Sequence, residues 1–280
     1  MGNIQPLEPQ NGFKFGLIGW PLDYSLSPAI YEAFFRSTGL GGEYAAYPVL
    51  PAELKETLSE LLCSGITGLN VTCPHKAAAA SICNELESHA RELKVINTMH
   101  ITHDSITGYN TDVYGFNRYI DECGLSEPFY VMGSGSAALA VDYVLNDRHL
   151  RYEMYCRNPR SWHGIAPAGT LEGLNDVLLR SEAGTVVNAT TLGWGDEDIF
   201  PVEKTLLRGM VFADLNYNSS WHWRNDLPNH GADVFTGETM LVHQAAGSFE
   251  IWTGVKPSTD AVLETIKGKL EETKKGCDSR

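Results

Sequence analysis

The chain alternates short apolar runs with longer amphipathic stretches, and it contains no internal repeat. Residues 13–19, 43–49 and 66–72 have the length and apolar content of buried strands. The stretches between them carry apolar residues at helical spacing. No uninterrupted apolar run reaches the roughly 18 residues that a membrane-spanning helix needs. The pattern is typical of an α/β protein.

Local signals define the ends of several predicted elements. Residues 27–39 predict a helix with Ser27 as N-cap, Pro28 at the first helical position and Gly39 as its stop. A second helix is predicted over residues 51–65. The segment 98–112 predicts a hairpin, and residues 113–124 have the period of a connecting helix.

A second alternating block follows the connecting helix. It contains an apolar strand at residues 129–132, a glycine-rich turn and a helix, followed by predicted strands at 152–156, 185–190 and 211–216. We therefore predict a two-domain α/β fold with an interdomain cleft. Residues 1–112 form an N-terminal α/β substrate domain, completed by C-terminal helices within residues 238–270. Residues 113–237 form a Rossmann-like dinucleotide-binding domain.

Charge and cysteine content limit the classes of partner. The formal net charge of -14 argues against binding to nucleic acid or to anionic membranes. The six cysteines include no CxxC pair, which fits a reducing compartment. The first 12 residues contain no apolar leader segment. We expect a cytoplasmic protein with a small-molecule substrate, either a monomer or a homodimer.

The residues MGSGSAA predict a dinucleotide site. Gly133, Gly135 and Ala138 form a GxGxxA pattern between an apolar strand and a helix. Glycines at these positions let the backbone turn tightly and approach a pyrophosphate, which the N–H groups of the helix N-terminus then bind. The pattern alone is weak, because glycines in strand-to-helix turns are often turn residues only.

The end of the next predicted strand bears on the choice of dinucleotide. An NAD site places Asp or Glu about 20 residues past the first glycine, where it binds the ribose 2′-hydroxyl. This chain has YCRNPR there, with Arg157 and Arg160 and no carboxylate. Charge complementarity to a 2′-phosphate favours NADP, with NAD the less favoured cofactor. Solvated surface arginines are the alternative interpretation.

The residues GLNVTCPHK predict a strand followed by a helix that begins with Pro74 and has Lys76 near its start. The positive end of a helix disfavours an ammonium group, which suits a proton donor for a carbonyl reduction. Asp112, in the segment GYNTD, is the carboxylate best placed to orient this lysine. An exposed lysine without a chemical role is the alternative.

Seven segments resemble the shikimate dehydrogenase family, in the order that the family has them, between Phe15 and Gly254. They are SLSP (25–28), GLNVTCPHK (68–76), VINT (95–98), GYNTDVYGF (108–116), GSGSAALA (133–140), NATTLG (188–193) and ETMLVHQAAGSFEIWTG (238–254). The resemblance implies NADP-dependent, reversible reduction of 3-dehydroshikimate to shikimate.

The resemblance also implies a role for individual residues. Lys76 and Asp112 are the implied catalytic pair. Substrate-binding roles are implied for Ser25 and Ser27, which bind the carboxylate, and for Thr72, Asn97, Tyr217 and Gln244. The cofactor positions are Gly133, Ser134, Gly135, Ser136, Ala137, Arg157, Asn158, Arg160, Asn188, Thr190 and Gly237, and no metal is expected. Ser27 also fits a simple helix cap, which is compatible with anion binding.

Several segments depart from the family pattern. Tyr24 stands where the family has His, and Ser136 replaces a glycine of the phosphate turn. Lys94 and Val95 replace the usual Gly-Ala, and CRN replaces the NRT cofactor signature. The family motif NATPxGM reads NATTLGW in this chain, and NYNSSWHWRND stands where the family has a Pro-containing loop. A paralogue acting on quinate or a related cyclohexane acid therefore stays open, as does a non-catalytic ligand-binding protein with the same pocket.

Three further features have two interpretations each. The HxxH spacing of His100 and His103 suits zinc, but on a hairpin the two side chains point to opposite faces. His75 is either a proton relay or, the favoured interpretation, a solvated histidine at a helix start. Trp221 and Trp223 either flank a ligand or a dimer contact, or pack in the interior.

Overall fold

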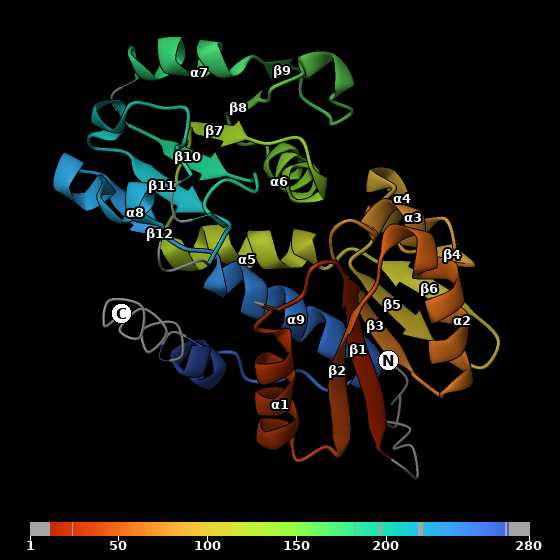
Figure 1. Ribbon diagram of the computed structural model, residues 1–280. Coiled ribbons are helices and arrows are strands. Elements are labelled where there is room, and N and C mark those ends of the chain that lie inside the picture. Colours follow the sequence, from red (N-terminus) through yellow and green to blue (C-terminus); the bar gives the residue numbers. More distant parts are fainter. Residues whose placement is uncertain are drawn as a thin grey trace. The chain divides into compact units, whose positions relative to one another are not determined.

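The computed structural model describes residues 12–23, 25–181, 183–195, 198–217, 221–266 and 268 (Figure 1). Tyr24, one of the departures noted above, lies outside the described residues, as do residues 267, 269 and 270 of the predicted C-terminal helices. The chain divides into two compact units. The first comprises Met1–Gly115 and Val242–Ile266, and the second comprises Phe116–Leu241 and Lys267–Arg280.

A six-stranded mixed sheet forms the centre of the first unit, with the order β2-β1-β3-β5-β6-β4. Only β5 is antiparallel to its neighbours among these strands. The predicted hairpin of residues 98–112 is the β5-β6 pair. The strands are β1 (Phe13–Gly19), β2 (Gly42–Pro48), β3 (Gly68–Val71), β4 (Glu85–Leu86), β5 (Thr98–Ile101) and β6 (Ile106–Tyr109).

Helices cover the sheet of the first unit. They are α1 (Ser27–Thr38), α2 (Leu54–Cys63), α3 (Lys76–Ala80), α4 (Ser88–Leu93) and the part of α9 (Glu238–Thr253) from residue 242 onward, with α5 (Asp112–Cys123) leading into the second unit. Gly39 ends α1 in the left-handed conformation, as predicted. The prediction for Ser27 was wrong. Leu26 is the N-cap, Ser27 is the first helical residue, and no side chain caps this end.

Aromatic side chains fill one face of the first sheet. Phe15 of β1 lies 4.5 Å from the Trp252 ring of α9 and 5.7 Å from the Phe35 ring of α1, measured between ring centroids. A Cβ on Gly68 would lie 2.6 Å from Trp252, so this strand position admits no side chain. Because of this packing, the C-terminal segment is part of the core of the first unit.

The opposite face of the first sheet carries an aliphatic core. Residues of α2, α3 and α4 pack there against alternate residues of β1, β3 and β5. This alternation is the two-residue period of a strand that is buried on both faces. The buried members include Ile18, Leu54, Leu58, Leu61, Leu69, Val71, Ala79, Ala90, Met99 and Ile101.

The second unit contains a fully parallel six-stranded sheet with the order β12-β11-β10-β7-β8-β9. Counted from β7, the order is 3-2-1-4-5-6, the doubly wound Rossmann arrangement. Strand order reverses between β7 and β10, where ligands bind at the carboxyl ends of such sheets. The strands are β7 (Phe129–Met132), β8 (Tyr152–Tyr155), β9 (Ala168–Gly169), β10 (Thr185–Asn188), β11 (Val211–Asp214) and β12 (Asp233–Phe235).

The second unit also contains α6 (Ser136–Asp147), α7 (Leu171–Leu178) and α8 (His222–Asn225). Its core includes Trp221, which is fully buried, together with Phe200 and Phe212. Of the two interpretations of Trp221, interior packing is therefore correct.

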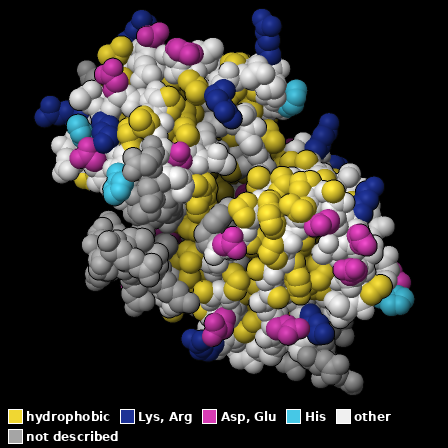
Figure 2. Space-filling view, viewed as in Figure 1, with side chains coloured by type: hydrophobic (Ala, Val, Ile, Leu, Met, Phe, Trp, Pro, Cys, Tyr) yellow, Lys and Arg dark blue, Asp and Glu magenta, His cyan; other side chains and the backbone are white. Residues whose placement is uncertain are grey.

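Charged side chains of both signs are interspersed on the face of the molecule shown in Figure 2, where Lys and Arg are scattered among Asp and Glu. Among the described residues, none of the helices combines the length and apolar character required to cross a bilayer.

Candidate functional site

Lys76 and Asp112 form an ion pair in the first unit. Lys76 is the first residue of α3 and Asp112 the first residue of α5, and Lys76 Nζ lies 2.5 Å from Asp112 Oδ2. The helix start predicted at Pro74 was two residues early. The side chains are 15% and 9% exposed, respectively, so solvent screens the pair only weakly.

Asn97 joins this pair to Gln244. Its Nδ2 donates to Asp112 Oδ1 at 2.8 Å and to Gln244 Oε1 at 3.1 Å. The amide orientation of Asn97 is set by the backbone N–H of Thr111, which donates to Asn97 Oδ1 at 2.8 Å. Gln244 Oε1 is the acceptor in this hydrogen bond, so the Gln244 side chain donates through its amide nitrogen Nε2. Four residues predicted from the sequence thus form one hydrogen-bonded group.

A network of buried hydroxyl and amide groups contacts the Asn97 side chain through Thr98 and Thr111. The sequence did not identify this network. Ser248 of α9 lies 2.7 Å from Thr98 Oγ1 and 3.1 Å from Thr111 Oγ1, and it accepts a hydrogen bond from Asn70 Nδ2 at 3.0 Å. These residues are all at least 95% buried. Their only sequence signal is the position of Asn70, Thr98 and Thr111 within the NVT, NT and NTD motifs, and of Ser248 within the segment 238–254.

Ser25, Ser27 and Thr72 belong to the same unit. The Ser27 backbone N–H donates to Ser25 Oγ at 3.3 Å, which keeps the two serines together at the start of α1. Since Ser27 does not cap the helix, capping does not account for its hydroxyl. The Tyr44 hydroxyl donates to Asn70 Oδ1 at 2.9 Å in the same unit. Thr72 is half-buried directly after β3.

His75 is buried, so its interpretation as a solvated histidine is wrong. Its Nε2 lies 2.7 Å from the carbonyl oxygen of Val49. A carbonyl oxygen only accepts, which identifies Nε2 as the protonated nitrogen. This hydrogen bond ties the residue before Lys76 to the segment after β2, and so helps to fix the start of α3.

We call the hydrogen-bonded set of Lys76, Asp112, Asn97 and Gln244 the Lys76 group. It links one ammonium, one carboxylate and two amides through hydrogen bonds. The carboxylate and the amides offer acceptors and donors for neighbouring hydroxyl groups of a polyol. The ammonium is a proton source that a bound oxyanion can use. This group is thus suited to hold a hydroxylated ring and to exchange a proton with one of its oxygens.

In the second unit, the GxGxxA turn follows β7 and precedes α6. Gly133 has a φ of +147°, and a Cβ there would lie 2.6 Å from the carbonyl oxygen of Ala189, in the loop after β10. A side chain at position 133 would therefore separate the two loops at the point where the strand order reverses. Ser134 and Gly135 are exposed, and Ser136 and Ala137 are half-buried at the start of the 12-residue helix α6.

A buried polar group holds the loop after β10. Asn188 Oδ1 accepts hydrogen bonds from both the backbone N–H and the hydroxyl of Thr190, while Asn188 Nδ2 donates to Asp214 Oδ1 at 2.9 Å. Arg224 Nη1 lies 2.8 Å from Asp214 Oδ2, and this ion pair is almost fully buried. Burial raises the pKa of Asp214 to about 6, and the Arg224 charge opposes the rise.

The remaining predicted residues are all in the second unit. Arg157, Asn158 and Arg160 are exposed, in the loop after β8. Gly237 precedes α9, where a Cβ would lie 2.1 Å from the Leu215 carbonyl oxygen. The Tyr217 ring packs edge-on against Trp194, with the ring centroids 5.0 Å apart.

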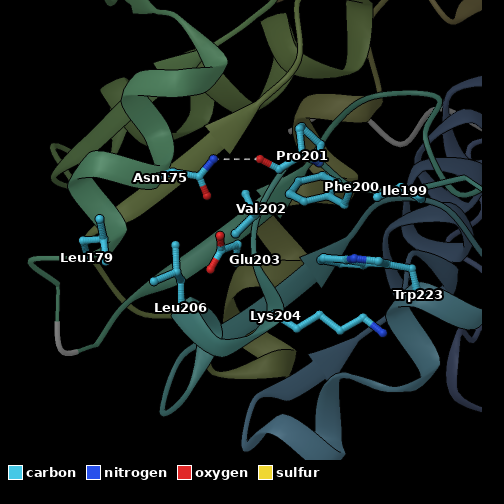
Figure 3. A pocket seen from close by; sticks show the side chains of 10 residues that line it. All are labelled: Asn175, Leu179, Ile199, Phe200, Pro201, Val202, Glu203, Lys204, Leu206 and Trp223. Carbon is cyan, nitrogen blue, oxygen red and sulfur yellow. Dashed lines mark hydrogen bonds between the residues drawn. The ribbon is translucent and has the colours of Figure 1, made fainter.

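Ten residues of the second unit line a pocket of about 540 Å³ (Figure 3). Its lining includes Trp223, Phe200 and the exposed Ile199, and Asn175 Nδ2 donates to the Pro201 carbonyl oxygen at its edge. None of the predicted catalytic, substrate or cofactor residues lines it. The Trp223 ring stacks on Trp221, with the ring centroids 5.5 Å apart, and it also lines this pocket.

The two histidines of the HxxH segment differ in environment. His100 lies in β5 and is half-buried, and burial lowers its pKa. His103 is in the following turn, where Nδ1 lies 2.7 Å from Asp104 Oδ1, and both side chains are exposed. Within the part of the chain that the structure describes, no three His, Cys, Asp or Glu side chains are grouped as a metal site requires.

Comparison with known proteins adds independent observations. Residues 17–99 match the family model of the shikimate dehydrogenase substrate binding domain, and residues 237–267 match that of the shikimate 5'-dehydrogenase C-terminal domain. The first match includes Ser25, Ser27, Thr72, Lys76 and Asn97, and the second includes Gln244.

The similarity to individual proteins extends over nearly the whole chain. A shikimate dehydrogenase (NADP(+)) of Pyrococcus abyssi is 30% identical over 261 residues, which cover 91% of this chain and 98% of the relative. The crystal structure of shikimate dehydrogenase from Aquifex aeolicus has a TM-score of 0.82 at 26% identity, covering 92% and 98% of the two chains. The Thermus thermophilus enzyme in complex with NADP(H) and shikimate has a TM-score of 0.78 at 27% identity, covering 90% and 97%. With both sheets, the Lys76 group and these similarities in agreement, the chain belongs to the shikimate dehydrogenase family.

Proposed function

We propose that this protein catalyses the NADP-dependent, reversible reduction of 3-dehydroshikimate to shikimate. The observation that carries the proposal is the hydrogen-bonded group of Lys76, Asp112, Asn97 and Gln244 in the first unit. Its donors and acceptors match a ring with neighbouring hydroxyls, and its ammonium matches a carbonyl that becomes a hydroxyl. The similarity to the Thermus thermophilus complex, which contains NADP(H) and shikimate, supports the same assignment.

Lys76 has a defined task in this reaction. The oxygen of the substrate carbonyl gains negative charge as it is reduced, and Lys76 Nζ donates a proton to it. Asp112 holds the ammonium through Oδ2, while Asn97 holds Asp112 through Oδ1. The carboxylate is thus fixed at both oxygens, so Lys76 Nζ is ordered before the substrate arrives. In the reverse direction, the same pair receives the proton.

The residues of the second unit fit an NADP molecule. Gly133 allows the close approach of the backbone, and the N-terminus of α6 offers free N–H groups to a pyrophosphate. Arg157 and Arg160 are the cations we assign to the 2′-phosphate, with Asn158 beside them. Ser134, Gly135, Ser136, Ala137, Asn188, Thr190 and Gly237 complete the proposed binding set. When bound, NADPH supplies the hydride.

An assay with purified protein tests the function. Shikimate with NADP should give reduced cofactor, detected by its absorbance, and quinate or NAD should give less. No cofactor reduction with either acid, together with normal shikimate binding, would leave a non-catalytic binding protein. Faster turnover of quinate than of shikimate would identify a quinate-type paralogue.

We expect Ser25→Ala with Ser27→Ala to raise KM for shikimate by about tenfold or more while kcat falls little. The reason is that the substrate carboxylate has the same charge in the ground state and in the transition state, so its contacts stabilise both equally. Steady-state kinetics with varied shikimate checks this. Ser37→Ala removes a hydroxyl near the other end of α1, which donates to the Phe34 carbonyl, and serves as the control. An unchanged KM in the double variant would place the carboxylate elsewhere.

We expect Arg157→Ala to weaken NADPH binding by about ten- to a hundredfold and to leave NADH binding nearly unchanged. NADH has no 2′-phosphate, so a lost charge-assisted hydrogen bond affects only NADPH. Titration of each cofactor by fluorescence measures both constants, and Arg160→Ala should have a smaller effect. Arg151→Ala, which removes an exposed arginine paired with Glu127, is the control. Equal weakening of both cofactors would mean that Arg157 is structural.

We also propose a cytoplasmic location and a division of labour between the units. All five cysteines among the described residues are thiols, which supports a reducing compartment and is testable by cell fractionation. The first unit, close to predicted residues 1–112 with 238–270, would bind the substrate. The second, close to predicted residues 113–237, would bind NADP. The serine and Arg157 variants test this division, since each should affect one ligand only.

A further inference from the structure

Asp142 is a buried carboxylate that no step of the proposed reaction uses. It lies in α6, the helix after the glycine turn, and is 1% exposed. Burying a carboxylate is costly unless its oxygens are well bonded. Three donors bind it: Tyr152 OH at 2.9 Å and Ala166 N at 3.1 Å, both on Oδ1, and Ile165 N at 2.5 Å on Oδ2.

Two of these three donors belong to the loop between β8 and β9, residues 156–167, which we call the arginine loop because it carries Arg157 and Arg160. Asp142 binds the backbone at the returning end of this loop. Trp162 holds the same end, because its Nε1 donates to the Ala166 carbonyl oxygen at 2.7 Å. The arginine loop is thus tied both to α6 and to itself.

Packing around Asp142 shows that these backbone hydrogen bonds hold the loop close to the helix. A Cβ on Gly164 would lie 2.0 Å from the Trp162 ring and 2.5 Å from Asp142 Oδ2, so only glycine fits there. The side chain of Ile165 is 53% exposed, so its burial contributes little to holding this segment. The backbone N–H groups of residues 165 and 166 attach this segment to α6 through the Asp142 carboxylate.

We propose that Asp142 is a positioning residue for cofactor preference, a proposal that rests on the proposed NADP-dependent function. Asp142 holds the arginine loop in the conformation in which Arg157 and Arg160 receive the 2′-phosphate. A loop that is ordered beforehand loses less conformational entropy when the phosphate binds. NADH has no 2′-phosphate and gains nothing from that order. Asp142 therefore favours NADPH over NADH without touching either cofactor.

Asp142→Asn is the sharpest test, because asparagine has a single acceptor oxygen. Whichever way its amide turns, one of the N–H groups of Ile165 and Ala166 faces an NH2 donor. We expect the ratio of kcat/KM for NADPH to that for NADH to fall by about tenfold, through KM for NADPH, with NADH kinetics within about twofold. Tyr152→Phe removes the third donor but neither bond to the loop, so this control should keep the wild-type ratio.

Trp162→Phe gives an independent test, because it removes the Nε1 bond to Ala166 and leaves Asp142 in place. It should lower the ratio in the same direction, which keeps the proposal testable if Asp142→Asn does not fold. An unchanged ratio in the folded variants, or equal losses with both cofactors, would overturn the role of Asp142. A wild-type protein without preference for NADPH would instead refute the cofactor assignment itself, and that result is obtained before any variant is made.

Discussion

Replacing Lys76 by alanine should lower kcat for shikimate oxidation by about 10²- to 10⁴-fold, the usual contribution of a proton-transfer group. Shikimate binding should stay within about tenfold, because Asp112, Asn97 and Gln244 still contact the ring hydroxyls in the proposed complex. Steady-state kinetics and a shikimate titration separate the two effects. The loss concerns proton transfer to one oxygen, so it should appear in kcat and not mainly in KM.

Two further lysine variants make this result specific. Lys76→Arg keeps the positive charge near Asp112 but replaces the ammonium by a guanidinium, which does not deprotonate in proteins, so kcat should remain low. Lys55→Ala removes an exposed lysine of α2 and should leave kcat unchanged. If Lys76→Ala retains near-normal kcat, another group supplies the proton and the mechanism proposed for the Lys76 group is wrong.

Replacing Arg224 by methionine should lower the free energy of unfolding by about 3–5 kcal/mol at neutral pH, the usual result of removing one partner of a buried ion pair. Asp214 would lose its compensating charge in a position with no exposure to solvent, so the folded state must either bury an unpaired carboxylate or take up a proton. The matched control is Lys204→Met, which breaks the more exposed Lys204–Asp226 pair in the same unit and should cost at most about 1 kcal/mol.

The cost of the Arg224 variant should depend on pH in a definite direction. Burial already raises the pKa of Asp214 to about 6 in the presence of Arg224, and loss of the arginine charge raises it further. A carboxyl whose folded pKa lies above its unfolded value stabilises the protein most below the unfolded pKa, and this contribution is lost as pH rises through the folded pKa. Urea unfolding should therefore show a smaller deficit, relative to wild type, at about pH 5 than at about pH 8. A deficit independent of pH would show that Asp214 is not the cause.

Much of the fold follows from signals that are local in the sequence. Strands such as β1, β3 and β7 have apolar runs. The GxGxxA pattern after β7 indicates a tight turn, which needs glycine. The two-residue strands β4 and β9 carry no such signal, because so few residues define no period. They exist because neighbouring strands offer them hydrogen-bonding partners.

The candidate site also contains both residues that local motifs predict and residues that only tertiary packing brings together. Lys76, Asn97, Asp112 and Gln244 stand in recognisable motifs, and the structure places them within hydrogen-bond distance of one another. The burial of His75 depends on a carbonyl 26 residues away, at Val49, and no local pattern gives this contact. The same holds for Ser248, whose partners Asn70, Thr98 and Thr111 come from three other segments. Contacts that tertiary packing creates are the part that the sequence did not reveal.

The first unit depends on the far end of the chain, and this has a consequence during synthesis on the ribosome. The strands that the structure describes in the second unit lie between residues 129 and 235, so the nascent chain contains this sheet before α9 has been translated. The first unit at that stage lacks Gln244, Ser248 and Trp252. The Trp252 ring covers Gly68, and Ser248 binds Thr98 and Thr111, which in turn bind the Asn97 side chain. The residues translated first therefore complete their core and their hydrogen-bonded group only when translation has passed residue 253. Because the chain is synthesised from its N-terminus, the second unit can be completed before the first unit, which contains Lys76.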